Sequence, residues 1–286
     1  MLVVTYALSL KYVPAVLVDA RRITPDQFAG KKLDEIKKIV LLEGGREVRI
    51  GELFDIVGPE RAPENPGDIE ILLKQGSNKL CYLGYRMSGG RIVVEGDVGH
   101  FTGYKMRGGS IVVKGNTRNY TGSKMRGGTI EVLGDAGHKL GGKLQGEKPG
   151  KGMKGGKIIV HGRAGAEVGV GMKSGTIIIH GDAGNLVGVD MQGGTIVVVG
   201  NAGIYPGTNM YAGKIVIGGK VECLLPSFYA DAILPSVKAK GIRFDKSFML
   251  FIGDAIVGGR GLLYLSYEDN KALLEPYKEL VEGMRL

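Results

Sequence analysis

Two histidines lie at equivalent positions of a repeated segment, where they could begin a metal site. His161 and His180 occupy the same position of two successive repeats in the middle of the chain. Paired imidazoles are common zinc ligands, but a zinc site needs at least one more protein ligand. The same position of the neighbouring repeats holds Leu133 and Val199, which cannot bind a metal. We therefore expect structural histidines at strand ends and no metal site in this chain.

The remaining reactive residues do not form a catalytic set either. Cys81 and Cys223 lie far apart in a sequence without a CxxC motif, which argues against a four-thiolate zinc site or an iron–sulfur cluster. The sequence has no Ser/His/Asp set, no HExxH motif and no GxxxxGK[ST] phosphate loop. We predict no catalytic residue and no cofactor in this chain.

A row of cations flanks one position of the repeat. We call it the basic edge, and it comprises Lys105, Arg107, Lys124, Arg126, Lys154 and Lys173. If successive repeats stack as strands do, these charges lie about 4.8 Å apart per layer, and their repulsion is costly unless water or an anion neutralises it. The simpler interpretation is a solvated edge. The functional interpretation is contact with an acidic subunit or an anionic ligand, which the net charge of +9 also allows.

Methionine shows the period of the elements that position these side chains. Seven of the ten methionines recur in steps of 19, with one step of 28, at Met87, Met106, Met125, Met153, Met172, Met191 and Met210. Each is followed by a glycine-bounded group of four residues rich in β-branched side chains, such as Ile92-Val-Val-Glu95, which is typical of a strand. A strand and two shorter sides in each repeat describe one turn of a parallel β-helix with glycine at its corners.

The predicted fold class is therefore all-β, a right-handed parallel β-helix of about seven 19-residue turns with small α/β caps at both ends. The first and third residues of each group of four are apolar throughout and should face inward, and the methionines should fill the remaining interior. The second, outward residue is also apolar in six of seven turns. These six form what we call the apolar stripe, namely Val93, Val112, Ile159, Ile178, Val197 and Val216. Either a partner or a flanking segment of this chain should cover them.

Outside the period, the sequence predicts three parts. They are an N-terminal α/β cap over 1–66, the β-helix over 67–221 and a C-terminal cap with a terminal helix over 222–286. Thr24-Pro-Asp should start a helix, followed by the amphipathic segment 33–40, and Asp269–Met284 should be helical. Residues 69–76 are out of phase and suggest a degenerate capping turn. The extra residues within 142–152 should form a surface loop, a feature that repeat proteins often use for binding.

The apolar start of the chain does not predict a membrane anchor. Residues 1–18 are interrupted by Lys11 and Pro14, and they are too few to span a bilayer. We expect a cytoplasmic protein with no membrane span and no nucleic-acid partner.

The repeated pattern Met-x-Gly-Gly-x-Ile-x-Val-x-Gly-[Asp/Asn]-x-Gly-x-x-x-Gly resembles the GXGXG β-helix family. That family includes the C-terminal domain of the glutamate synthase large subunit and the C subunit of formylmethanofuran dehydrogenase. The flanks resemble this C subunit, in the segments Phe28-Ala-Gly-Lys-Lys-Leu-Asp-Glu-Ile36, Val48-Arg-Ile-Gly-Glu-Leu-Phe-Asp-Ile-Val-Gly58 and Gly253-Asp-Ala-Ile-Val-Gly-Gly-Arg-Gly-Leu-Leu-Tyr264. The resemblance covers about residues 24–267.

This resemblance implies a non-catalytic scaffold subunit of a complex that reversibly reduces CO2 and forms N-formylmethanofuran. In that family the tungsto- or molybdopterin, the [4Fe-4S] clusters and the zinc belong to other subunits. The implied partners are thus a pterin/Fe-S subunit, an amidohydrolase subunit and ferredoxin-like subunits. The basic edge would then meet an acidic subunit or the carboxylate-bearing tail of methanofuran. Two alternatives stay open: a glutamate-synthase-like structural domain acting in trans, and a stand-alone β-helix enzyme.

Overall fold

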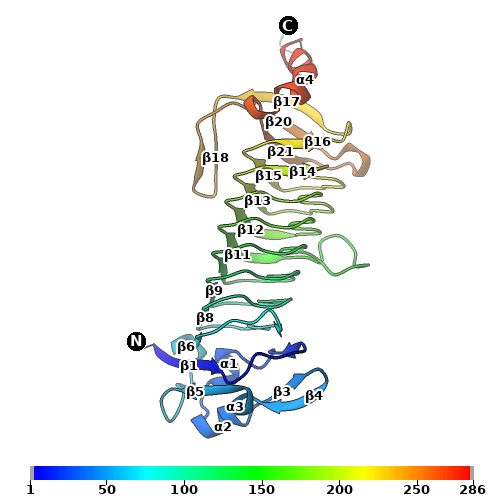
Figure 1. Ribbon diagram of the computed structural model, residues 1–286. Coiled ribbons are helices and arrows are strands. Elements are labelled where there is room, and N and C mark those ends of the chain that lie inside the picture. Colours follow the sequence, from blue (N-terminus) through cyan, green and yellow to red (C-terminus); the bar gives the residue numbers. More distant parts are fainter. Residues whose placement is uncertain (1–2, 284–286) are drawn as a thin grey trace. The chain divides into compact units, whose positions relative to one another are not determined.

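The computed structural model describes residues 3–283 and consists mostly of strands, with a few short helices (Figure 1). The chain divides into two compact units. The N-terminal unit comprises Met1–Gly137 and Gly156–His161, and the C-terminal unit comprises His138–Gly155 and Gly162–Leu286. Within the described residues, no helix is both long enough and apolar enough to cross a membrane.

The N-terminal unit is built on a sheet whose neighbouring strands follow the order β5-β1-β6-β8-β9-β10-β11. These strands are β1 (Val4–Leu10), β5 (Phe54–Val57), β6 (Ile69–Leu73), β8 (Arg91–Val94), β9 (Ser110–Val113), β10 (Thr129–Val132) and β11 (Lys154–Val160). All pairs are parallel except β1 with β5. Residues at the same position of the repeat face one another, so that Ile92 pairs with Ile111 and Ile111 with Ile130.

The interior of this unit follows the predicted pattern. The inward residues Ile92, Ile111 and Ile130 are fully buried, as β-branched side chains on one face of a parallel sheet should be. The methionines that precede these strands are buried as well, which confirms that they fill the core. The corner glycines are tightly enclosed: Gly109 has φ +75°, and a Cβ there would lie 2.5 Å from the carbonyl oxygen of Gly90 and 2.6 Å from Met87 Cε, so only glycine fits.

Side-chain caps join successive repeats at the corner after each strand. Asp97 Oδ1 accepts a hydrogen bond of 2.8 Å from the backbone N–H of Asn116, and Asn116 Oδ1 accepts one of 2.8 Å from that of Asp135. In the C-terminal unit, Asp182 Oδ1 caps the N–H of Asn201 in the same way. These bonds satisfy backbone donors that the corner leaves unpaired, which gives the [Asp/Asn] position of the repeat a structural role.

The flank before the repeat contains short helices and a second sheet of order β4-β3-β2-β7. Its elements are β2 (Val18–Asp19), α1 (Pro25–Phe28), α2 (Leu33–Lys37), β3 (Val40–Glu43), β4 (Arg46–Arg49), α3 (Ile50–Leu53) and β7 (Leu80–Cys81). Thr24 caps α1 as predicted, since its side chain accepts a hydrogen bond from the backbone of Gln27. The helix predicted over 33–40 ends at Lys37, because Val40 begins the β3–β4 hairpin.

One expectation about this flank was wrong. Residues 69–76 do not form a degenerate cap, since Ile69–Leu73 is a full strand, β6, that pairs in parallel with β8 on one side and with β1 on the other. The chain start therefore extends the sheet by a strand that lies outside the repeat. Pairing between residues so far apart in sequence leaves no periodic signal.

The C-terminal unit holds strands in the order β12-β13-β15-β21-β20-β17 and two smaller pairs, β14-β16 and β18-β19. Their bounds are β12 (Ser174–Ile179), β13 (Thr195–Val198), β14 (Ala202–Ile204), β15 (Lys214–Ile217), β16 (Val221–Cys223), β17 (Tyr229–Leu234), β18 (Val237–Ala239), β19 (Ile242–Phe244), β20 (Phe248–Gly253) and β21 (Gly261–Ser266). The pairs from β12 to β21 are parallel, whereas β21, β20 and β17 are antiparallel. β21 thus continues the register of the repeat with residues from beyond it.

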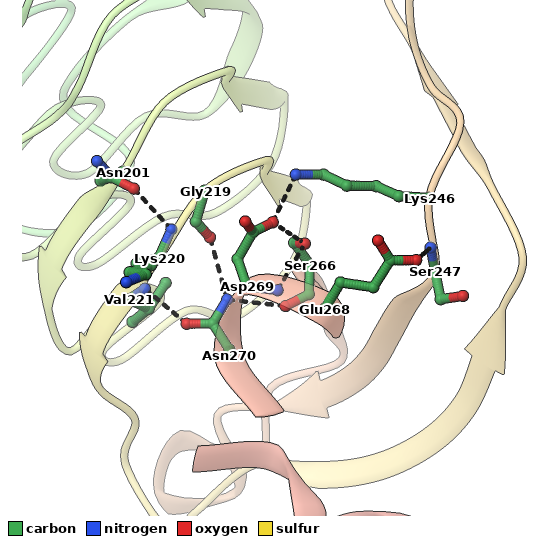
Figure 2. Close-up of polar contacts among 10 residues, drawn as sticks. All are labelled: Asn201, Gly219, Lys220, Val221, Lys246, Ser247, Ser266, Glu268, Asp269 and Asn270. Atoms are coloured by element: carbon green, nitrogen blue, oxygen red, sulfur yellow. Dashed lines mark hydrogen bonds and ion pairs between the residues drawn. The ribbon is translucent and has the colours of Figure 1, made fainter. Parts of the chain in front are cut away.

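A polar cluster closes the repeat at this end (Figure 2). The buried Asn270 accepts a hydrogen bond from the backbone N–H of Val221 and donates to the carbonyls of Gly219 and Ser266. Beside it, Asp269 accepts from Lys246 and Ser266, and these contacts hold the pKa of the Asp269 carboxyl below its usual value. Asn270 thus satisfies the N–H of Val221 and the carbonyl of Gly219, two backbone groups that follow the last strand of the repeat.

A helix follows directly. α4 (Lys271–Gly283) confirms the predicted terminal helix within the described residues; Met284, the predicted end, lies outside them. Leu274 and Val281 are buried, Leu273 is half-buried and Leu280 is exposed, so the apolar face is narrower than the sequence suggested. Pro276 lies inside the helix.

Candidate interaction surfaces

The histidines lie at strand ends, as predicted. His161 directly follows β11, and its Nε2 is 2.8 Å from Glu131 Oε1; His180 directly follows β12. Across residues 3–283, no three His, Cys, Asp or Glu side chains gather closely enough to hold a metal ion. Burial raises the pKa of the Cys81 thiol, which makes it a weak nucleophile at neutral pH. That other subunits carry the cofactors stays a prediction.

Four members of the basic edge belong to the N-terminal unit. Hydrogen bonds between successive repeats hold them in rows, since Arg107 N–H donates to Met87 O at 2.8 Å and Arg126 N–H donates to Met106 O at 2.7 Å. Lys105 N–H donates to the carbonyl of Ser123, next to Lys124, at 3.0 Å. The arginines are exposed and the lysines half-buried. The structure therefore brings these four cations to one corner of neighbouring repeats.

That corner contains little negative charge. Of the described residues, no carboxylate lies within ion-pair distance of Lys105, Arg107 or Arg126. Lys105 Nζ instead lies 5.1 Å from the ring centroid of Tyr104, and Arg86, one repeat before Lys105, lies 5.2 Å from that of Tyr85. Contacts of this kind attract a cation to the face of a ring but leave its charge unneutralised.

Next to these cations runs an aromatic column that the sequence analysis missed. Tyr82, Phe101 and Tyr120 stack with centroids 4.6 and 4.8 Å apart and nearly parallel rings. All three have positive φ, which fixes the corner from which their side chains project. The guanidinium of Arg21 covers the outer face of Tyr82 at 4.3 Å. The three residues share one position of the repeat, and this recurrence in the sequence could have revealed the column.

An apolar cavity of about 390 Å³ lies beside the aromatic column in the same unit. It is lined by Leu17, Val18, Asp19, Leu42, Gly44, Gly45, Cys81, Tyr82 and Phe101. Leu17 and Leu42 are 54 % and 43 % exposed, and Val13 and Val16 nearby in sequence are exposed as well. Sequence reasoning did not identify this surface, because it is made by loops and strands of the flank that have no repeat.

The corner of the C-terminal unit is organised differently. Lys154 and Lys173 of the basic edge are exposed there, but the neighbouring cations are paired. Lys143 Nζ lies 3.2 Å from Asp190 Oδ2 and Lys139 Nζ lies 3.4 Å from Glu167 Oε2. Lys143 Nζ also donates to the carbonyl of Glu147 at 2.6 Å, within the predicted loop of residues 142–152, while its ion pair with Asp190 ties this loop to the repeats.

A glycine makes the first of these ion pairs possible. A Cβ at Gly171 would lie 2.6 Å from Lys143 Cδ, so the lysine passes over a position that has no side chain. The loop and the paired residues border a polar cavity of about 280 Å³. The loop is present as predicted and projects from the repeats in Figure 1.

The apolar stripe also differs between the units. In the N-terminal unit Val93 is buried, while Val112 and Ile159 are half-buried. In the C-terminal unit Ile178 is 4 % exposed and Val197 and Val216 are fully buried. These three pack in one cluster with Val237, Ala239, Phe244, Phe248 and Tyr264, and the hairpin of β18 and β19 runs alongside their strands (Figure 1). Of the two expected covers, a partner or a flanking segment of this chain, the structure shows the flanking segment over Ile178, Val197 and Val216. These three residues are therefore not a partner interface.

Over part of its length, the chain is similar to C subunits of formylmethanofuran dehydrogenases. No family model matches the chain. It is 38 % identical over 96 residues to the C subunit of the tungsten-containing formylmethanofuran dehydrogenase 2 of Methanothermobacter wolfeii, which covers 33 % of this chain and 34 % of the relative. It is 34 % identical over 82 residues to the C subunit of the molybdenum-containing formylmethanofuran dehydrogenase 1 of Methanosarcina barkeri. That alignment covers 29 % of this chain and 27 % of the relative. The aligned part thus spans about a third of these relatives' length.

A solved structure extends the likeness over most of the chain. One chain of the formyltransferase/hydrolase complex from Methylorubrum extorquens, determined with methylofuran, superposes with a TM-score of 0.76 at 28 % identity. The superposition covers 91 % of this chain and 99 % of that chain. The fold and the repeat define a glycine-rich protein of stacked, mostly parallel strands. More particularly, part of the chain is similar in sequence to the C subunit of formylmethanofuran dehydrogenase, which confirms the resemblance predicted from the repeat and its flanks.

Proposed function

We propose that this chain is a non-catalytic scaffold subunit of a formylmethanofuran dehydrogenase complex, which reversibly reduces CO2 and forms N-formylmethanofuran. One observation carries the proposal: the likeness to a chain of the formyltransferase/hydrolase complex covers 91 % of this chain, with 28 % identical residues. The shorter matches to the C subunits point to the same role. They favour it over a glutamate-synthase-like domain acting in trans and over a stand-alone β-helix enzyme.

The proposal includes the finer architecture, a right-handed parallel β-helix over 67–221 between caps at 1–66 and 222–286. Two features support it. Parallel strands pair in register from one repeat to the next, and a second line of parallel bridges follows each strand, through Val98, Thr117 and Ala136 in the N-terminal unit. A chain that pairs on two sides at the same period is expected to wind as a solenoid.

In the complex, the tungsto- or molybdopterin, the [4Fe-4S] clusters and zinc would be carried by a pterin/Fe-S subunit, an amidohydrolase subunit and ferredoxin-like subunits. This chain would hold such partners through surfaces that its own elements leave open. Those surfaces are the half-buried stripe residues Val112 and Ile159 and the basic edge. The basic edge would face either an acidic subunit or the carboxylate-bearing tail of methanofuran.

Affinity purification of the tagged chain from cells that express the whole complex tests this function. We expect the other subunits to co-purify in fixed stoichiometry, with molybdenum or tungsten, iron and zinc in the complex but none in the chain purified alone. The isolated chain should not form N-formylmethanofuran. A metal or cluster bound at one per isolated chain, or activity of the chain alone, would contradict the scaffold role.

A further inference from the structure

The N-terminal unit carries a surface that combines a row of cations with stacked rings. We call it the cationic corner, and it comprises Arg86, Lys105, Arg107, Lys124 and Arg126 together with Tyr82, Tyr85, Phe101, Tyr104 and Tyr120. The segments that supply these residues, 82–86, 101–107 and 120–126, contain no Asp or Glu. The three segments lie in successive repeats, joined by the backbone bonds from Arg86 to Tyr104 and from Lys105 to Ser123.

Most ring faces of the aromatic column are already occupied. Both faces of Phe101 are covered, by Tyr82 and Tyr120, and Arg21 covers the outer face of Tyr82. Proteins that bind single-stranded nucleic acid stack bases on free ring faces, and Tyr82 and Phe101 offer none. Ring edges carry partial positive charge, so they add to the field of the neighbouring cations. The surface therefore favours oxyanions over planar aromatic groups.

The spacing of the cations indicates the form of the anion. Arg86, Lys105 and Lys124 occupy one position in three successive repeats, and neighbouring strands lie about 4.8 Å apart, so the row spans about 10 Å. An extended polypeptide covers that distance with about three residues. A short extended segment with acidic side chains thus matches the length of the row and can reach the charges of Arg86 and Lys105.

The C-terminal unit shows what the same corner looks like when no external anion is needed. There the chain itself supplies the carboxylates, Asp190 for Lys143 and Glu167 for Lys139. These pairs relieve repulsion for Lys139 and Lys143. Among the described residues, no carboxylate pairs with Lys154 or Lys173, which occupy the repeat position of Arg107 and Arg126. In the N-terminal unit the described chain provides no such carboxylate for Arg107 or Arg126, although their repulsion is of the same kind.

We propose that the cationic corner binds an acidic extended segment of a partner subunit. The partner's membership of the enzyme complex rests on the function proposed above, whereas the chemistry of the contact rests on the charges and rings described here. Because the arginines are exposed, the contact is screened by salt and contributes chiefly to encounter and selectivity.

Charge reversal in the intact complex provides the test. The variant Arg107→Glu/Arg126→Glu should weaken assembly of the co-expressed complex about tenfold at low ionic strength, measured as the amount of partner subunits recovered per tagged chain. The loss should disappear at about 0.5 M salt, where the Debye length is a few ångströms. Lys148→Glu/Lys151→Glu is the matched control. Both lysines are exposed on the loop of the C-terminal unit, and their reversal lowers the net charge as much as the reversal of the two arginines does. The control variant should assemble like the wild type.

Carbodiimide cross-linking of the wild-type complex, which joins lysines only to carboxylates in contact, should couple Lys105 or Lys124 to Asp or Glu of one partner segment. If the wild type assembles and the double reversal assembles equally well at low salt, the inference is overturned and the scaffold role stands. If the wild type recovers no partner, the proposed function itself fails. Salt-dependent binding of a labelled single-stranded oligonucleotide that the reversal abolishes, with assembly unaffected, would assign the corner to nucleic acid instead.

Discussion

The two units use one repeat to build opposite surfaces. In both, the inward Ile and Val side chains and the methionines are buried, and Asp or Asn side chains cap the next repeat. Outside that shared interior, the stripe residues Val112 and Ile159 of the N-terminal unit are half-buried, whereas the C-terminal unit covers its part of the stripe. The arginines Arg107 and Arg126 have no carboxylate partner among the described residues, whereas Lys143 in the C-terminal unit pairs with Asp190. The interior is thus fixed by packing, while the outward positions are free to vary with what each unit must contact.

The stripe gives the sharpest test of this contrast. Val216 is fully buried under the β18–β19 hairpin and Val112 is half-buried. Val216→Asp should lower the free energy of unfolding by about 4 kcal/mol or prevent folding, because it buries an unpaired carboxylate. Val112→Asp should cost less than about 1 kcal/mol. Denaturant unfolding, followed by circular dichroism, measures both free energies. Equal losses of stability would show that the stripe is covered to the same extent in the two units.

The hairpin that covers the stripe can be weakened without touching the repeat. Phe244 packs in the cluster with Val197 and Val216, with its ring centroid 5.3 Å from that of Phe248. Phe244→Ala should cost about 3 kcal/mol and increase binding of a hydrophobic dye, since the stripe becomes exposed. Tyr229→Ala, at an exposed position of β17, serves as control and should change stability by less than about 0.5 kcal/mol. Unchanged dye binding in the Phe244 variant would argue against the hairpin as the cover.

The ion pairs at the corner predict a smaller difference. Lys143→Met should cost about 1–2 kcal/mol, because it leaves the half-buried Asp190 without its cation and frees the carbonyl of Glu147. It should also speed protease cleavage within residues 142–152. The matched change in the N-terminal unit, Lys105→Met, removes one of several like charges and should leave stability within about 0.5 kcal/mol. If the Lys143 variant keeps the stability of the wild type, or its loop is cleaved at the same rate, the contact between Lys143 and Asp190 does not hold the loop.

Acid should affect the C-terminal closure through Asp269. Its pKa is lowered in the folded state by Lys246 and Ser266, so its contribution to stability is present above the unfolded value of about 3.9 and is lost as pH falls through the folded pKa. Asp269→Asn should cost about 1 kcal/mol at pH 7, and the difference from wild type should shrink below about pH 4. Asp231→Asn, on an exposed position of β17, should show no such pH dependence. Thermal unfolding between about pH 2.5 and 7 measures this difference, and a difference that persists in acid would refute the role of Asp269.

Features that depend on the repeat could be predicted from the sequence, because each one recurs. The strands around Ile92, Ile111 and Ile130, the buried methionines and the Asp/Asn caps all follow from local patterns at a fixed period. The aromatic column at Tyr82, Phe101 and Tyr120 recurs at the same period, so it was predictable as well. The insertion near residue 142 was also evident, as a break in the period.

The sequence by itself therefore determined which side chains form the interior of the repeat, because inward positions tolerate only apolar residues and show them again in every repeat. It also determined the resemblance to the C subunit. The tertiary structure alone decided which outward residues are covered. β6 and β1 join the sheet, β18 and β19 cover Ile178, Val197 and Val216, and Lys143 reaches Asp190 across Gly171. Each of these contacts joins segments whose separation in sequence follows no period. Their partners are set by how the chain packs in three dimensions, so no local pattern could reveal them.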